Sequence, residues 1–161
     1  MEKTATISKC GLYRYDLTRR WAEGGTTCAF VGLNPSTADA EFDDPTIRRC
    51  IGFAKSWGHN RLVMLNAYAF RATNPKDMKA ADDPIGLLND EHLFFWLLNH
   101  CKVAVAAWGV NIDPVRQKWL LEKFSSLNIL KLTKDGFPSH PLYLSKNLLP
   151  RPWLHNLLDM V

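Results

Sequence analysis

The stretch Cys28-Ala-Phe-Val-Gly-Leu-Asn-Pro-Ser-Thr-Ala-Asp39 decides how the rest of the sequence is interpreted. Its first six residues form an apolar run with the length and composition of a buried parallel strand. Proline excludes the residue before it from the helical region, so the strand ends in an extended or turned Asn34. Open α/β sheets bind their ligands at the carboxyl ends of such strands. By itself, the stretch is equally consistent with an ordinary exit from a strand into a loop.

The composition is that of one globular domain spanning residues 1–161. Hydrophobic residues make up 47% and charged residues 22% of the chain, and this length is enough for one hydrophobic core. The formal charge of +4 and the pI near 8.9 are compatible with a polyanionic partner but are not specific to one. The amino terminus lacks the apolar segment of a secretion signal, and no apolar run is long enough to span a bilayer. We therefore expect a cytoplasmic protein that does not contact membranes.

The cysteines and histidines give no sign of a metal site. The four cysteines, at positions 10, 28, 50 and 101, contain no C-x-x-C pair, and the histidines show no ligand spacing. We expect no metal and no cofactor, and buried free thiols at Cys28, Cys50 and Cys101.

Strand patterns alternate with helix patterns along most of the chain. Strands are predicted at residues 28–33, 61–66, 102–107 and 128–133, and helices at residues 46–57, 85–100 and 115–127. Each predicted helix follows an aspartate that can cap it and a proline suited to the first turn: Asp44-Pro45, Asp83-Pro84 and Asp113-Pro114. The alternation predicts a three-layer α/β/α domain, in which helices cover both faces of a mostly parallel four-stranded sheet.

The two ends of the chain carry weaker patterns. Residues 12–17 alternate between large apolar and polar side chains, and residues 20–22 are predicted to pair with them in an edge hairpin. At an edge, the arginines and Asp16 of this hairpin would face solvent. Residues 146–161 are interrupted by two prolines and are predicted to form a closing helical turn and tail.

All four predicted core strands end in polar or aromatic side chains. The carboxyl ends of parallel strands lie along one edge of a sheet, so we expect these side chains to line one ligand crevice. They are Asn34, Asn66 with Arg71, Trp108, and His140.

Three short motifs resemble those of the uracil-DNA glycosylase superfamily. Gly32-Leu33-Asn34-Pro35 is similar to the first motif of its mismatch-specific and single-strand-selective branches. Residues 65–73 are similar to its second segment, and His140-Pro141 resembles the start of its last motif. From residue 13 to about residue 150, the chain more closely resembles an uncharacterised bacterial and phage family (domain of unknown function 1643). That family shares the signature Gly-Leu-Asn-Pro-Ser-Thr-Ala-Asp, the helix start Asp-Asp-Pro-Thr-Ile-Arg-Arg and the ending His-Pro-Leu-Tyr.

The resemblance implies a uracil-DNA-glycosylase-like fold and a DNA glycosylase-like hydrolase. Such an enzyme, as in DNA repair, cleaves the N-glycosidic bond of a damaged or modified nucleobase in DNA or in a nucleotide. The leaving base then needs a donor for its developing negative charge, which His140 would supply as a neutral imidazole. Asn34 would position the attacking water. Asp39 is the favoured catalytic carboxylate, because Asp44 is better explained as a helix cap.

The remaining candidates would surround these groups. Residues expected to bind the substrate are Gly32, Leu33, Pro35, Ser36, Thr37, Asn66, Tyr68, Phe70, Arg71, Trp108, Gly109 and Pro141. Residues expected to bind phosphates are Arg48, Arg49 and Lys76.

Three positions depart from the glycosylase motifs. Ser36 replaces a usual glycine, and Leu142 and Tyr143 replace a serine and a proline that help to grip duplex DNA. Single strands and free nucleotides therefore remain open as substrates. Two other functions fit the same pocket: a non-catalytic module that binds a nucleotide or modified base, and an enzyme that transfers groups on phage-type modified bases. The sequence leaves the base and the oligomeric state open.

Overall fold

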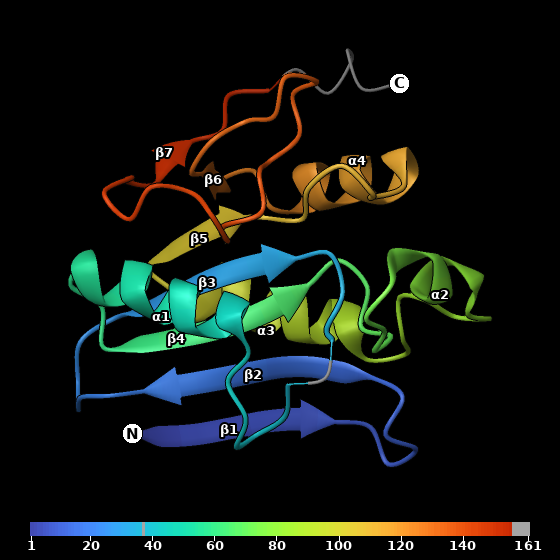
Figure 1. Cartoon of the computed structure of the whole chain (residues 1–161), viewed down its shortest axis with the longest axis horizontal. Helices are drawn as coiled ribbons and strands as arrows, with labels where there is room; N and C mark the ends of the chain where they lie inside the picture. The colour runs from blue at the N-terminus through green and yellow to red at the C-terminus, as the bar shows by residue number, and fades with distance from the viewer. Residues whose placement is uncertain (37, 156–161) are drawn as a thin grey trace.

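The computed structural model describes residues 1–36 and 38–155, and in this part of the chain seven strands form one mixed sheet with four helices around it (Figure 1). In chain order the elements are β1 (Glu2–Ile7), β2 (Arg14–Arg20), β3 (Thr27–Gly32), α1 (Pro45–Ser56), β4 (Arg61–Asn66), α2 (Pro75–Ala80), α3 (Asn89–Asn99), β5 (Val103–Ala106), α4 (Pro114–Lys123), β6 (Asn128–Ile129) and β7 (Arg151–Pro152).

The strand order is β1-β2-β4-β3-β5-β6-β7. The strands β4, β3, β5 and β6 are parallel to one another, which confirms the parallel centre expected from the sequence. β2 is antiparallel to β4, and β1 and β7 add an antiparallel strand at each edge. In the central pair, Gly32 lies opposite Asn66. The two strand-end motifs therefore finish level with each other.

Helices cover both faces of the sheet. Ala29 and Val31 of β3 belong to a core that includes residues of α2, α3 and α4, whereas Cys28 and Phe30 belong to a second core with α1. This division follows from the two-residue period of a strand, which sends alternate side chains to opposite faces. In Figure 1, α1 lies in front of the sheet and α3 lies behind it.

Two of the three predicted helix starts are confirmed. The Asp44 carboxylate accepts a hydrogen bond from the backbone nitrogen of Ile47 at 2.8 Å, and Pro45 opens α1. Asp113 caps α4 in the same way, and Pro114 follows it. Such caps satisfy backbone donors that have no partner within the helix.

The predicted start at Asp83-Pro84 is wrong. Asp83 accepts a hydrogen bond from the backbone of Gly86 in a turn, and α3 begins later, at Asn89. The loop before it contains a further short helix, α2, which is capped by Asn74 and was not predicted. A capping aspartate followed by proline also fits a turn, so the local pattern did not distinguish the two.

The predicted amino-terminal hairpin is wrong in its pairing. β2 pairs with β1 on one side and with β4 on the other, and residues 20–22 form no second strand of a hairpin. Because β1 covers its outer edge, β2 is buried. Arg14, Asp16 and Arg19, three of the polar side chains expected to face solvent, are 3%, 7% and 0% exposed.

The carboxyl-terminal third also differs from expectation. β6 has two residues instead of the six predicted, and the chain then turns back so that Leu132 bridges Pro138. In place of a closing helical turn, the described residues contain turns and the strand β7, and residues 156–161 lie outside the description. Within residues 1–36 and 38–155, no helix has the length and apolar character needed to cross a bilayer.

Candidate functional site

A pocket of about 530 Å³ opens at the carboxyl ends of the parallel strands, and we call it the strand-end pocket. It is lined by residues that follow β3, β4, β5 and β6 and by residues at the start of α1. Nine of the residues expected from the sequence line it: Gly32, Leu33, Asn34, Pro35, Ser36, Asn66, Trp108, Gly109 and His140.

Asn34 joins the loops that follow β3 and β4. Its amide nitrogen donates to the carbonyl oxygen of Ala72 at 2.8 Å and to that of Pro35 at 3.2 Å. The amide oxygen of Asn34 has no hydrogen-bond partner in the described part of the chain. The side chain therefore has a structural role and also leaves one acceptor for a ligand or a water molecule.

Asn66 is a buried amide with an unsatisfied donor. The residue is 4% exposed, and its side-chain nitrogen has no hydrogen-bond partner among the described residues. A side chain on Gly32 would place its Cβ 2.9 Å from the amide oxygen of Asn66, so only glycine leaves this amide undisturbed. Asn89 supports the same strand end by donating to the carbonyl oxygens of Asn66 and Ala67. Buried donors without partners are rare and costly, and this one lines a pocket.

His140 presents one ring nitrogen as a donor. Its Nδ1 accepts a hydrogen bond from the backbone nitrogen of Leu142 at 3.2 Å, so the neutral ring carries its proton on Nε2. Partial burial lowers the pKa of His140, and the charge of Asp44 opposes this effect. The ring is therefore neutral at pH 7 and can donate through Nε2.

Asp44, and not Asp39, is the carboxylate that lines the pocket. Its Oδ1 caps α1, and its Oδ2 accepts a hydrogen bond from the hydroxyl of Ser36 at 3.2 Å. Asp39 is exposed and accepts backbone hydrogen bonds from Phe42 and Glu41, which lower its pKa. The sequence preference for Asp39 as the carboxylate beside Asn34 and His140 does not match this placement.

Arg14 lines the pocket and was missed by the sequence analysis. One terminal nitrogen, Nη1, donates to the carbonyl oxygen of Ala38 at 2.9 Å, whereas Nε is buried and has no partner in the part of the chain that the structure describes. Burial lowers the pKa of Arg14 to about 10, and Asp44 opposes this effect. The guanidinium is therefore cationic at neutral pH. The alternating pattern around residue 14 gave no signal for this role, because it fits an exposed edge strand equally well.

Trp108 forms a fixed wall of the pocket. It is buried, its indole nitrogen donates to the side-chain oxygen of Gln117 at 2.8 Å, and its ring packs against Trp153. It therefore belongs to the core as well as to the pocket lining.

One family model matches the chain: the family described as "Protein of unknown function (DUF1643)" matches over residues 14–142 of the 161. The chain belongs to the DUF1643 family. No curated protein and no solved structure matches it. The DUF1643 match starts at Arg14 and includes every residue that lines the strand-end pocket. The pocket is thus contained in the part of the chain that defines the family.

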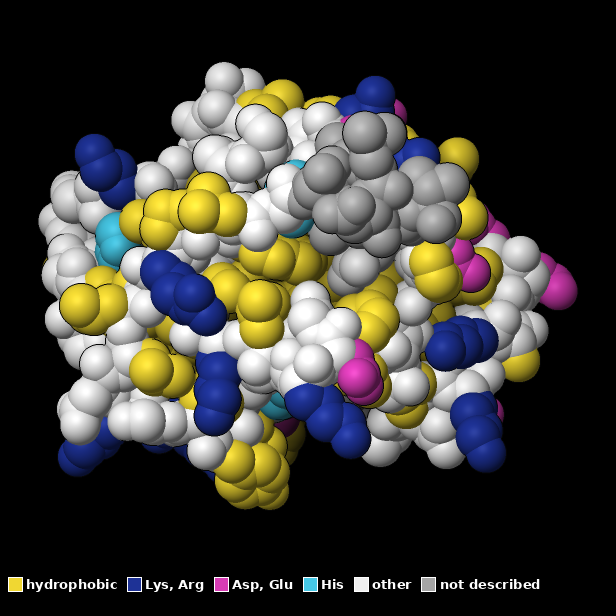
Figure 2. All heavy atoms as spheres, turned by 90° about the horizontal axis from the view of Figure 1, so that it is seen from above, with side chains coloured by type: hydrophobic (Ala, Val, Ile, Leu, Met, Phe, Trp, Pro, Cys, Tyr) yellow, Lys and Arg dark blue, Asp and Glu magenta, His cyan; other side chains and the backbone are white. Residues whose placement is uncertain are grey.

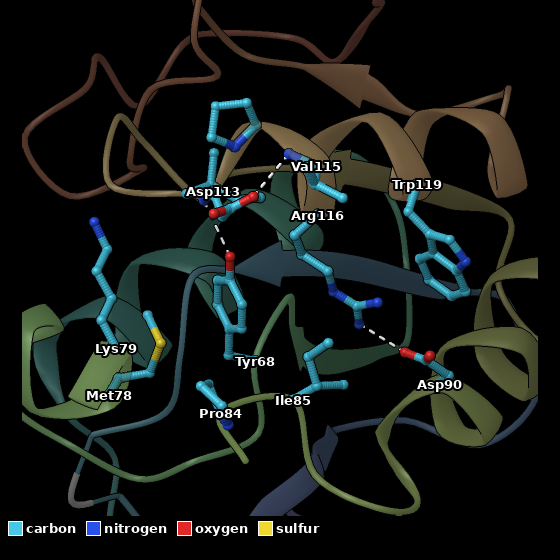
Figure 3. Close-up of a pocket in the computed structure, with 12 residues that line it drawn as sticks. Tyr68, Met78, Lys79, Pro84, Ile85, Asp90, Asp113, Val115, Arg116 and Trp119 are labelled. Carbon is cyan, nitrogen blue, oxygen red and sulfur yellow. Dashed lines mark hydrogen bonds and ion pairs between the residues drawn. The ribbon is translucent and has the colours of Figure 1, made fainter. Parts of the chain in front are cut away.

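The DUF1643 domain has a second pocket, of about 650 Å³, which contains Tyr68 (Figure 3). The Tyr68 hydroxyl accepts a hydrogen bond from the backbone nitrogen of Asp113 at 3.0 Å. Arg116 reaches across this pocket to Asp90, with 2.6 Å between nitrogen and oxygen, and lies over the ring of Trp119. Tyr68 therefore lines the second pocket and not the strand-end pocket, which Asn34 and Asn66 line.

Three other substrate-binding candidates that the structure describes are also not part of the strand-end pocket lining. Phe70 packs edge-on against Tyr13. Arg71 donates to the carbonyl oxygen of Gly11 in a small groove that shares Ser36, Ala72 and Thr73 with the strand-end pocket. Pro141 is buried beside His140 but does not line the pocket. Thr37 lies outside the described residues.

The predicted phosphate-binding residues are dispersed. Arg48 and Arg49 line a shallow groove on α1 with Lys146, and Lys76 is exposed on α2. On the face shown in Figure 2, lysine and arginine side chains lie apart from one another among apolar and polar ones. Among the residues that the structure describes, no three His, Cys, Asp or Glu side chains are grouped so that they could hold a metal ion.

Proposed function

We propose that this DUF1643 protein hydrolyses the N-glycosidic bond of a nucleobase and that the strand-end pocket is its active site. The observation that carries the proposal is the convergence of three complementary groups on one pocket. These are the free amide oxygen of Asn34, the unsatisfied amide of Asn66 and the Nε2 donor of a neutral His140. Together they match the needs of the reaction: an acceptor for the attacking water, an amide that can hydrogen-bond the edge of the base, and a donor to the leaving base.

In the proposed reaction, the bond between the base nitrogen and the sugar C1′ breaks, and its electron pair goes to the base. Water adds to C1′ and loses a proton, and the base gains one. His140 donates to the base oxygen as negative charge develops there, which stabilises the transition state. Asn34 accepts from the attacking water, and Asn66 hydrogen-bonds the edge of the base.

Asp44 takes the carboxylate role that the sequence analysis gave to Asp39. Both of its oxygens already accept hydrogen bonds, so its contribution is a fixed negative charge near the sugar as the sugar becomes cationic. This arrangement needs no proton transfer to the carboxylate.

The fold supports the proposal through its parallel central strands and its helices on both faces. Together with the three motifs, these features support our proposal of a uracil-DNA-glycosylase-like three-layer fold. Its seven strands exceed the four of the predicted sheet. A cytoplasmic location and a nucleic acid or nucleotide partner belong to the same proposal.

The test is release of the base from substrates that carry uracil, mismatched thymine, hypoxanthine or 5-substituted pyrimidines, each as an oligonucleotide and as a nucleotide. We expect His140→Ala to lower the single-turnover rate by about a hundredfold or more, while the affinity for intact substrate changes little. His100→Ala is a matched control, because His100 stacks on Phe95 away from the pocket. Equal rates for the wild-type protein and His140→Ala would contradict the assigned role.

A second candidate, a non-catalytic module that binds the nucleotide, is favoured by one observation. Both oxygens of Asp44 already accept hydrogen bonds and Asp39 lies outside the pocket lining, so the described lining has no carboxylate free of other contacts to act as a general base. Such a module would release no base in any variant, and His140→Ala would weaken binding by about 1–3 kcal/mol. The rate and the affinity, measured on the same proteins, distinguish the two functions.

A further inference from the structure

Arg14 differs from the other buried arginines in lacking an ion-pair partner. Three arginines are buried in the described part of the chain. Arg19 pairs with Asp43 at 2.7 Å and Arg116 pairs with Asp90 at 2.6 Å, whereas no carboxylate of the described residues lies within ion-pair distance of Arg14. A buried charge is unfavourable unless an opposite charge and hydrogen bonds compensate it.

The unsatisfied edge of Arg14 is suited to an oxyanion. Nη1 is occupied by the carbonyl oxygen of Ala38, which leaves Nε and Nη2, and Nε is buried without a partner among residues 1–36 and 38–155. Two adjacent guanidinium nitrogens bind two oxygens of a carboxylate or phosphate side by side. Because Arg14 lines the strand-end pocket, a ligand in this pocket can supply the missing anion.

Arg14 lies toward one end of the row of strand ends that lines the pocket. Arg14 belongs to β2, next to β4 and its terminal Asn66, whereas His140 follows β6 toward the other end of the sheet. Asp44 lines the same pocket at the start of α1, and its charge acts on both Arg14 and His140. A ligand that spans the pocket would therefore place an anionic group at Arg14 and extend past Asn66, on the neighbouring strand, toward His140.

We propose that Arg14 binds the phosphate of a free mononucleotide whose base lies at Asn66 and His140. The identity of the base end rests on the proposed function, and the phosphate end rests on Arg14 alone. A free nucleotide fits better than a nucleic-acid strand, since Arg14 is only 3% exposed and a terminal phosphate reaches such a group without flanking nucleotides. The residues expected to bind the phosphates of a nucleic-acid strand do not line this pocket; they are Arg48, Arg49 and Lys76.

The test compares binding of nucleosides with binding of their 5′-monophosphates by isothermal titration at fixed ionic strength. The probes are deoxyuridine, thymidine, deoxycytidine, deoxyadenosine and deoxyguanosine, each with and without the phosphate. We expect the wild-type protein to bind at least one monophosphate about 10- to 100-fold more tightly than its nucleoside, as a charge-assisted hydrogen bond provides. Arg14→Met should reduce this ratio to less than about threefold, and Arg14→Lys should restore part of it.

Arg20→Met is the matched control, because Arg20 lies on the same strand, pairs with Glu2 and changes the net charge equally. Its ratio should equal that of the wild-type protein. The inference is overturned if no monophosphate binds more tightly than its nucleoside, or if Arg14→Met keeps the wild-type ratio. If Arg14→Met does not fold, the Arg14→Lys ratio decides, and an unchanged ratio overturns the inference. Tighter binding of a single-stranded decanucleotide than of every monophosphate overturns the assignment to a free nucleotide.

The titration measures binding and the base-release assay measures hydrolysis, so the phosphate site and the hydrolase activity are tested separately. A phosphate preference that depends on Arg14 without any release of base would refute the hydrolase and keep the phosphate site. Release of base with no phosphate preference would refute the phosphate site and keep the hydrolase.

Discussion

Replacing Arg14 by methionine should leave the fold as stable as the wild-type protein or more stable, although a buried arginine is lost. Burial lowers the pKa of Arg14 from 12.5 to about 10, a shift that corresponds to about 3 kcal/mol of unfavourable free energy for the buried cation. Arg14→Met removes this cost and loses one hydrogen bond to Ala38, worth about 1 kcal/mol. The expected net gain is therefore about 2 kcal/mol in the free energy of unfolding.

Arg19→Met should lower the free energy of unfolding, whereas Arg14→Met should raise it, so the two variants are compared. Arg19 is fully buried on the same strand, but it pairs with Asp43 and donates to the carbonyl oxygen of Thr18. Breaking a fully buried pair costs about 3–5 kcal/mol, and because the Asp43 side chain is 20% exposed we expect a loss in the free energy of unfolding at or below the lower end of that range. Urea unfolding at pH 7, followed by circular dichroism, measures both variants. A loss of more than 1 kcal/mol in Arg14→Met would show that Arg14 stabilises the fold and would refute this reasoning.

Two further predictions concern Asn66 and the buried Asp16. Gly32→Ala should displace the Asn66 amide, since the new Cβ would lie 2.9 Å from its oxygen. The displacement should lower nucleotide affinity or single-turnover rate by about a hundredfold. A variant with wild-type affinity and rate would contradict the role of Asn66. Burial raises the pKa of Asp16, but hydrogen bonds from His92 and Trp96 outweigh this effect and lower the pKa overall. The carboxylate therefore stabilises the fold above about pH 4, and this stability is lost as the pH falls through the pKa of the folded state. Asp16→Asn should lower the urea midpoint at pH 7 and flatten its decline between pH 7 and pH 3; two parallel pH curves would contradict this.

The centre of the fold could be predicted because its signals are local. The apolar runs that became β3 and β4 carry their own boundaries, and β4 has the predicted bounds. The start of α1 follows from Asp44 and Pro45, which act within a few residues of each other. Since parallel strands end along one edge, Asn34, Asn66 and His140 could be expected at one pocket.

The burial of β2 could not be predicted because its partners are distant in the sequence. Asp16 is 76 residues from His92, its hydrogen-bond partner, and Arg19 is 24 residues from Asp43. Without these partners in view, a strand with alternating charges fits an exposed edge, and the pocket residue Arg14 was placed in solvent for the same reason.

The loop after β4 shows a second limit. Tyr68 follows Asn66 by two residues, which would place both side chains on one face if the strand continued. The strand ends at Asn66, and Tyr68 reaches the second pocket instead. Side-chain direction in a loop depends on backbone contacts, such as the hydrogen bond from Tyr68 to Leu33, that no sequence period encodes.

The central claim, that the strand-end pocket holds a nucleotide, is tested most directly by a crystal structure of the protein with the deoxynucleoside 5′-monophosphate that binds most tightly. The account predicts the base edge at the side-chain amide of Asn66, the Nε2 of His140 at about 3 Å from a base oxygen, and the phosphate at about 3 Å from the guanidinium of Arg14. A nucleotide bound in the second pocket, between Tyr68 and Arg116, with the strand-end pocket filled only by solvent, would contradict it.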